Sequence, residues 1–395
     1  MFDAEKLLNA RVKSIPPSGI RKFFDIVSEL PDAISLGVGE PDFVTPWAIR
    51  DAAVKSIQKG YTQYTSNRGL PALREQIALY TEEGIGVSYD PVHEVLVTVG
   101  ASEAIDLAVR AVTEPGDEVL IPEPSYVSYS PCVRLAGGVP VIVPTTFAEE
   151  FKLNPAAVKR AITTKTKAII LPYPNNPTGA TMEKAALQKV ADVLSKHSIF
   201  VLSDEIYGEL TYGDATHASI ASLKNMRERT ILINGFSKAF AMTGWRLGYA
   251  CAPRAVVDAM TKIHQYTIMC APTAGQYAAL YALKSGRADG FAAVKEMRES
   301  YDTRRKLMVK SFRDMGLDCF EPQGAFYVFP SVAALEMDGE TFANKLLKEE
   351  EVAVVPGAAF GTYGASHVRC CYATGIKNLA EAMDRMRRFV RRNTR

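Results

Sequence analysis

The sequence predicts an α/β protein: a large three-layer αβα domain with a mainly parallel sheet, joined to a smaller α+β domain. From about residue 90, short β-branched runs, turns rich in Gly, Pro or Asn, and helical patterns follow one another repeatedly. Strands that alternate with helices are typical of a parallel sheet covered on both faces. At 395 residues the chain is also too long for one ordinary core.

The expected elements of the large domain come in a regular order. The strands are expected at VLVTV (95–99), EVLIP (118–122), KAIIL (167–171), IFVLSDE (199–205), TILIN (230–234) and LGYACAP (247–253). Helical patterns follow the first three of them, at residues 100–112, 124–137 and 182–197. In open α/β sheets ligands bind at the carboxyl ends of the strands, so these ends are the places to search for a site.

The regular alternation of strands and helices ends after a helical stretch at residues 288–315. Beyond it come CFEPQGAFYVFP, VAVVPG and VRCCYA, interrupted and followed by helices. We therefore expect a large domain at 45–285 and a small domain made of 1–44 and 286–395. At the end of the chain Leu379, Met383, Met386 and Val390 recur at helical spacing, which predicts a helix with one buried stripe and a wet face rich in arginine.

Composition excludes several classes of protein. The net charge is +2, with 46 Lys and Arg against 44 Asp and Glu. The overall charge is therefore too small to attract nucleic acid or an anionic membrane. The six cysteines form no C-x-x-C pair and share no metal-ligand spacing with the histidines, so no metal site is expected. Scattered thiols and an N-terminus without an apolar h-region indicate a cytoplasmic protein with no membrane span.

Polar residues follow several expected strands. Gly100-Ala101-Ser102 opens a helix, where small residues let backbone N–H groups approach a phosphate, although a serine near a helix start is more often only a cap. Asp204 ends a buried strand and needs hydrogen bonds or a cation, unless it only starts a helix. Taken alone, residues 175–179 (NNPTG) predict a turn. No P-loop is present, and LGVGEPD lacks the third glycine of a dinucleotide fingerprint.

Lys238 is the one charged side chain between Arg229 and Arg246, in the stretch ILINGFSKAFAMTGWRLGY. A lysine that loses water without gaining a partner has a lowered pKa, and its neutral amine is a nucleophile toward aldehydes. Arg246 follows eight positions later and could bind a phosphate. The alternative is a lysine whose ammonium reaches the surface.

Taken together, these motifs resemble the class I, fold-type I aminotransferases that use pyridoxal 5′-phosphate, in the subgroup of aspartate and aromatic amino-acid aminotransferases. The resemblance extends from SIPPSGIRKFFDI to VRCCYATG and depends on the order and spacing of the motifs. It implies the PLP-dependent transferase fold. It also implies that Lys238 in NGFSKAFAMTGWRLGY carries the cofactor as a Schiff base, while Ser237, Arg246, Ala101 and Ser102 bind its phosphate.

The resemblance also assigns residues to the cofactor ring. Asp204 in SDEIY matches the carboxylate that faces the pyridine nitrogen, and Tyr126 in EPSYVSY matches the stacking aromatic residue. Tyr207 and Asn176, the latter in NNPTG, match the groups that hydrogen-bond the phenolic oxygen. A charged pyridinium held by Asp204 would draw electrons from the substrate Cα.

Substrate and partner residues follow in the same way. Arg369 in HVRCCYATG matches the arginine that binds the substrate α-carboxylate, and Gly39 in LGVGEP would offer its backbone to the same group. Asn176 is also expected to contact the substrate. Ile20, in the SIPPSGI stretch, would close over bound ligand. Tyr64 resembles the tyrosine that reaches the partner's phosphate across a homodimer interface.

The activity implied is amino transfer between an L-amino acid and a 2-oxo acid, with 2-oxoglutarate as the expected acceptor. Some aspartate-preferring relatives carry a lysine after the glycine-rich turn, where this chain has Ser102, which favours aromatic or broad neutral donors. One alternative is a pyridoxal-phosphate-dependent C–S β-lyase, since it would share the cofactor groups. The other is a regulatory protein with an aminotransferase-like domain, although only about 45 residues precede the large domain.

Overall fold

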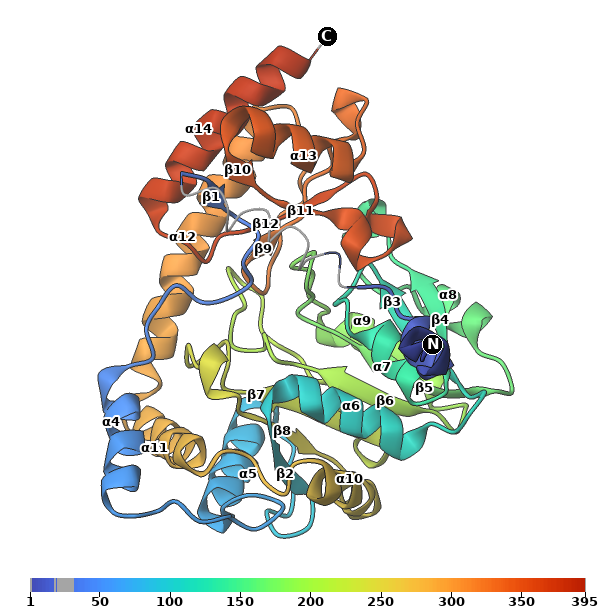
Figure 1. Ribbon diagram of the computed structural model, residues 1–395, viewed down its shortest axis with the longest axis vertical. Helices are drawn as coiled ribbons and strands as arrows, with labels where there is room; N and C mark the ends of the chain where they lie inside the picture. Colours follow the sequence, from blue (N-terminus) through green and yellow to red (C-terminus); the bar gives the residue numbers. More distant parts are fainter. Residues whose placement is uncertain (1, 18, 20–31, 395) are drawn as a thin grey trace.

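A seven-stranded sheet forms the centre of the large part of the molecule. The computed structural model describes residues 2–17, 19 and 32–394. Across the sheet the order is β2-β8-β7-β6-β5-β3-β4, and only β8 runs antiparallel to its neighbours. The strands are β2 (Val95–Thr98), β3 (Glu118–Glu123), β4 (Val139–Pro144), β5 (Thr166–Leu171), β6 (Phe200–Asp204), β7 (Thr230–Gly235) and β8 (Gly248–Cys251). The expected mainly parallel sheet is confirmed (Figure 1).

Helices cover both faces of this sheet. One face packs against α6 (Gly100–Val112), α7 (Tyr129–Leu135) and α10 (Arg254–Thr267). The other packs against α5 (Pro71–Ile85), α8 (Pro155–Ala161), α9 (Lys184–Leu194) and α11 (Thr273–Asp289), with α4 (Trp47–Gln58) lying on α11. Successive residues of each strand therefore enter opposite cores, because side chains alternate along a strand. The three-layer arrangement is the one expected.

Strand β4 was missed by the sequence reasoning. It pairs in parallel with β3 along its whole length and lies at the edge of the sheet. Its sequence, VPVIVP, contains two prolines, which cannot donate ladder hydrogen bonds and which argue against a central strand. At an edge one side of the strand needs no partner, so the prolines are tolerated.

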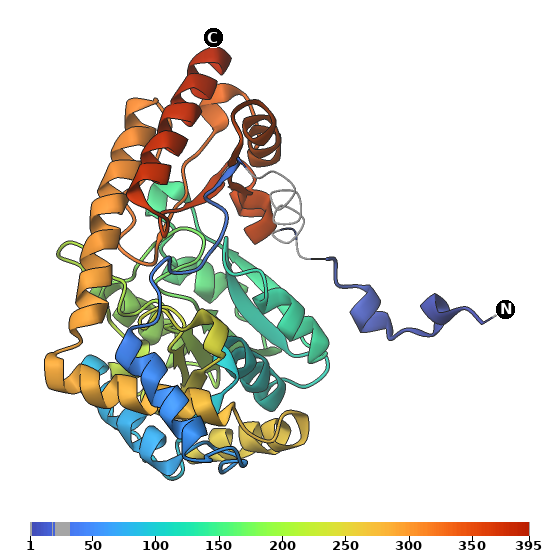
Figure 2. The same ribbon diagram turned by 60° about the vertical axis from the view of Figure 1, so that its left-hand side comes forward.

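The smaller sheets lie near the C-terminal part of the chain (Figures 1 and 2). β1 (Ile34–Ser35) pairs in parallel with β10 (Val352–Ala353), so a segment before residue 45 lies beside one after residue 286. A second sheet has the order β11 (Val355–Pro356), β12 (Val368–Cys371), β9 (Tyr327–Val328). The helices around them are α12 (Ala292–Asp314), α13 (Gly339–Glu350) and α14 (Ile376–Asn393). The domain limits at residues 45 and 285 stay a prediction.

Two further observations complete the fold. The apolar stripe expected at the end of the chain is buried on α14, at Leu379, Met383, Met386 and Val390. Near the other end, α1 (Ala4–Leu7) and α2 (Ala10–Lys13) project from the body of the molecule in Figure 2. Among the helices that the structure describes, none is both long and apolar enough to cross a membrane.

Candidate active site

Lys238 lies just beyond β7, and its ammonium has no acidic partner among the described residues. Nζ donates a hydrogen bond to the Gly39 carbonyl at 2.7 Å and lies 5.4 Å and 5.6 Å from the ring centres of Phe326 and Tyr207. Burial lowers the pKa of Lys238 to about 8, and the nearby Arg369 guanidinium adds to the effect. At pH 7 about one amine in ten is therefore neutral, against roughly one in 3,000 for an ordinary lysine.

Asp204 is the last residue of β6 and is buried. Its Oδ2 accepts a hydrogen bond from the Tyr129 hydroxyl at 2.7 Å, and its Oδ1 accepts one from the backbone N–H of Ile206 at 3.2 Å. Burial raises the pKa of Asp204 to about 6, while these two hydrogen bonds act in the opposite direction. Asp204 therefore does not start a helix, which was the alternative. It is a buried carboxyl group whose pKa lies about one unit below neutral pH.

Tyr207 also lies inside the molecule, next to a residue that the sequence reasoning missed. Its hydroxyl is 2.9 Å from the hydroxyl of Tyr327, on β9, and both rings are buried. A Cβ added to Gly39 would lie 2.4 Å from the Tyr327 hydroxyl, so this position accepts only glycine without movement. The N-terminal segment, the large sheet and the small sheet therefore meet around these two phenols.

Arg369, on β12, is buried beside Asn176. Nη1 donates to the Asn176 side-chain carbonyl at 2.9 Å, and Nη2 donates to the Gly37 carbonyl at 2.5 Å. Its guanidinium lies over the rings of Tyr327 and Phe360, at 4.5 Å and 4.8 Å. Nε is buried without a hydrogen-bond partner, and such a donor is rare in a folded protein unless a ligand meets it.

The two asparagines of the NNPTG stretch make different contacts. The side-chain oxygen of Asn175 accepts hydrogen bonds from the backbone N–H and the hydroxyl of Thr178, at 3.1 Å and 2.9 Å. This is the turn-forming role that the sequence alone suggests. Asn176 is left free to reach Arg369, as described above.

The start of α6 faces the side chain of Arg246. Gly100 has φ +75°, and a Cβ there would lie 2.6 Å from Nη2 of Arg246. Ala101 and Ser102 follow as the first residues of the helix, and Ser102 makes no capping hydrogen bond, because Val99 occupies the cap position without a side-chain contact. Free backbone N–H groups beside a guanidinium form a site suited to a phosphate.

The remaining expected residues are placed as follows. Ser237 is buried next to Lys238, and the Tyr126 ring packs edge-on against the ring of Tyr129 at 5.6 Å. Tyr64 is 79% exposed. Ile20 lies outside the described residues, so its expected closure over a ligand stays a prediction.

Comparison with known proteins identifies the family. The family model for aminotransferase class I and II matches residues 31–386. The chain belongs to this family. An aspartate aminotransferase from Pyrococcus abyssi is 47% identical over 384 residues, 97% of this chain and 98% of that protein. Aromatic-amino-acid aminotransferase 2 from Thermococcus litoralis is 44% identical over 384 residues, with the same shares.

A solved structure agrees. Aspartate aminotransferase from Thermus thermophilus with maleate is 39% identical and superposes with a TM-score of 0.92, covering 96% of this chain and 99% of that one. The chain is thus an aminotransferase of fold type I that depends on pyridoxal phosphate, as family members do. Among the described residues, no three His, Cys, Asp or Glu side chains are grouped so as to hold a metal ion.

The residues of this aminotransferase fit the cofactor. A primary amine with a lowered pKa suits its aldehyde, a buried carboxylate suits its ring nitrogen, and the α6 N-terminus with Arg246 suits its phosphate. The residues that sequence reasoning missed are Tyr129 and Tyr327. Tyr129 stands three positions after Tyr126 in the same motif, but its contact with Asp204 spans 75 positions and leaves no local signal.

Proposed function

We propose that this enzyme transfers an amino group between an L-amino acid and a 2-oxo acid, with 2-oxoglutarate as acceptor and Lys238 as the lysine that binds the cofactor. The observation that carries the proposal is an amine with a pKa of about 8 placed near an arginine with a free buried Nε–H. When bound, pyridoxal phosphate supplies an aldehyde that condenses with amines and a ring that accepts electrons from the substrate Cα.

The residues of the chain would act on that group in separate ways. Asp204 would hold a positive charge at the ring nitrogen, since its carboxylate already accepts two hydrogen bonds and lacks only a cation. Lys238, once free, would move a proton at the substrate Cα, a task suited to a base with a pKa near the working pH. Arg246 and the start of α6 would hold the phosphate.

Arg369 would bind and orient the substrate. A guanidinium presents a planar pair of N–H groups that matches a carboxylate, and the contacts to Asn176 and Gly37 hold it in one orientation. This fixes the direction of the Cα–H bond relative to Lys238. For the donor side chain we propose aromatic or broad neutral amino acids, because Ser102 is exposed and adds no cation for a second carboxylate.

The test of this proposal combines a chemical and a functional measurement. Borohydride reduction of the loaded enzyme should fix the cofactor to the peptide that contains Lys238, and Lys238→Ala should retain little transaminase activity. A screen of amino-acid donors against 2-oxoglutarate should then give the paired oxo-acid products. Pyruvate and a thiol formed without any oxo-acid acceptor would instead show the β-lyase.

We also propose that the enzyme works as a cytoplasmic homodimer in which Tyr64 reaches the cofactor phosphate of the partner. Tyr64 is highly exposed, and the nearby Asn67 bonds the Met269 carbonyl, beside the exposed apolar side chains of Tyr266 and Ile268. Exposed apolar groups gathered in this way favour an interface.

The dimer can be tested by mixing inactive subunits. Equal amounts of Tyr64→Ala and Lys238→Ala chains, refolded together, should regain roughly a quarter of the wild-type activity, because each mixed dimer has one complete site. No recovery, with mixed dimers present, would show that Tyr64 acts within its own subunit or not at all.

A further inference from the structure

A second buried acid, Glu205, directly follows Asp204 but lies on the opposite face of the sheet. Side chains alternate along a strand, so Ser203 and Glu205 face one way while Leu202 and Asp204 face the other. In agreement, Leu202 packs in the core beneath α6 and α10, and Asp204 bonds Tyr129 of α7. The proposed activity gives Glu205 no role, although burying a carboxylate is costly.

Three donors surround the Glu205 carboxylate. Oε1 accepts hydrogen bonds from the hydroxyls of Ser203 and Ser219, at 2.8 Å and 2.6 Å, and Oε2 lies 2.6 Å from Nε2 of His217. The Glu205 side chain is 2% exposed. An arrangement of donors alone suits an anion, and His217 is the one partner that can bring a positive charge.

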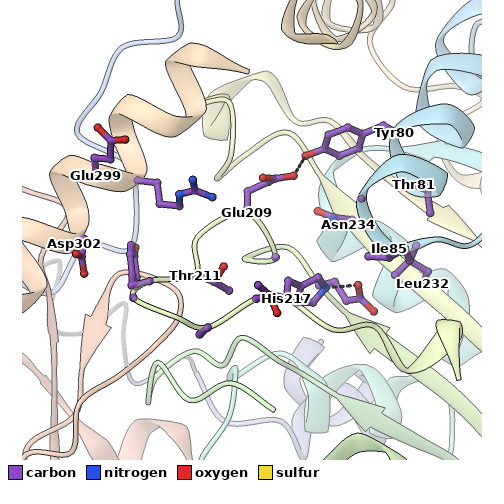
Figure 3. Close-up of a pocket in the computed structure, with 18 of the residues that line it drawn as sticks. Tyr80, Thr81, Ile85, Glu209, Thr211, His217, Leu232, Asn234, Glu299 and Asp302 are labelled. Carbon is purple, nitrogen blue, oxygen red and sulfur yellow. Dashed lines mark hydrogen bonds and ion pairs between the residues drawn. The ribbon is translucent and has the colours of Figure 1, made fainter. Parts of the chain in front are cut away.

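His217 lies in the wall of a cavity of about 770 Å³, between α5, the sheet and α12 (Figure 3). The charged and titratable groups that face this region come from several elements. They are Glu209, which bonds the Tyr80 hydroxyl; Tyr89, Tyr249 and Cys251 near Glu205; and Arg298, Glu299 and Asp302 on α12. The lining of this cavity includes none of Lys238, Asp204 and Arg369, so a proton from solvent can reach His217 without passing through the cofactor site.

We propose that His217 and Glu205 form a charge pair on the far face of β6 that acts as a positioning device for Asp204: it holds the end of the strand and cancels the field of Glu205 at its neighbour. This inference rests on the proposed role of Asp204 opposite the ring nitrogen. Two adjacent acids repel each other, so an uncompensated Glu205 would favour the protonated form of Asp204, which cannot neutralise a cationic ring.

The electrostatics of the three residues agree with this geometry. Burial by itself would lower the pKa of His217, but the Glu205 carboxylate, with help from Glu209, raises it overall. The same Glu205 charge raises the pKa of Asp204. Because the pKa of His217 is raised, the pair is complete at low pH and loses its cation as the pH rises through that pKa.

The charge on His217 can be measured directly. The chain has only five histidines, so imidazole ¹⁵N signals can be followed with pH in the cofactor-free protein, with His217→Gln used for assignment. We expect the His217 ring to be protonated at pH 7 and to titrate at lower pH in Glu205→Gln. A His217 ring that is neutral at pH 7 in the wild type would overturn the proposal, whatever the reaction.

The effect on Asp204 is tested by the pH dependence of pyridoxal phosphate affinity. His217→Gln keeps a donor for Glu205 but removes the charge, so the pKa of Asp204, and with it the acid limb of the affinity profile, should move up by about half a pH unit to one unit. Starting from a pKa of about 6, this means roughly two- to sixfold weaker binding at pH 6. Glu205→Gln and the double variant should show no upward shift. Ser219→Ala, which removes a donor without changing charge, is the matched control.

Two results would contradict a positioning role. If His217→Gln and Glu205→Gln shift the limb in the same direction, or if Ser219→Ala shifts it as much as His217→Gln, the cluster is only structural. Failure of the proposed role of Asp204 would look different. Asp204→Ala would then bind pyridoxal phosphate as tightly as the wild type, while the titration of His217 would be unchanged. If His217→Gln does not fold, the His217 ring signal is assigned from its change in Glu205→Gln, and the ring titration in the wild type and in Ser219→Ala still decides.

Discussion

Replacing Tyr129 with Phe should shift the ionisation of Asp204 into the neutral range. The substitution removes one hydroxyl and leaves the ring in place between Asp204 and Tyr126. The lost bond is 2.7 Å long, buried at both ends, and made to a carboxylate. Because Phe cannot donate a hydrogen bond, the ionised form of Asp204 loses a partner that the protonated form does not need, and the pKa of Asp204 rises.

The size of the shift follows from that bond. A hydrogen bond to a charged group contributes about 1.5–3 kcal/mol, which at 1.36 kcal/mol per pKa unit is a shift of about one to two units. The pKa of Asp204 would then rise from about 6 to between about 7 and 8. At pH 7 the ionised fraction would fall from about nine-tenths to between about a half and a tenth.

The assay is the affinity of cofactor-free enzyme for pyridoxal phosphate, measured spectroscopically between pH 5.5 and 9. The ratio of variant to wild-type affinity removes the titration of the free cofactor. We expect roughly two- to tenfold weaker binding at pH 7, closing toward no difference near pH 9. Tyr173→Phe is the matched control, because that buried hydroxyl donates only to the Phe151 carbonyl. A ratio that does not change with pH would refute the reasoning.

Two further predictions concern the same site. In cofactor-free protein the raised pKa of Asp204 contributes to the free energy of unfolding below about pH 4, and this contribution is lost as the pH rises through about 6. Between pH 4 and pH 7, the free energy of unfolding of Asp204→Asn should therefore rise relative to wild type by up to about 3 kcal/mol. Denaturant unfolding at both pH values measures this difference, and a difference that does not change with pH would contradict the prediction. Arg369→Lys should lower kcat/KM roughly 10- to 150-fold, chiefly through KM, because a lysine cannot make the two-point contact; a change confined to kcat would count against carboxylate binding.

Much of the fold was predictable because it depends on local pattern. Six of the seven strands of the large sheet and the helices after three of them follow from alternating apolar runs and turns. The two prolines of β4 argue against a central strand, and only the assembled sheet shows that its place is at the edge. The candidate residues Lys238, Asp204 and Arg369 were found through motifs in the sequence.

The sequence by itself determined the order of the elements, the family and the residue types at the strand ends. The tertiary structure decided the environments that give those residues their chemistry. The lowered pKa of Lys238 depends on burial and on Arg369, 131 positions away, and Asp204 depends on Tyr129, 75 positions away. Desolvation and charge coupling act through space, so they exist only after distant segments are packed together, and no local pattern records them.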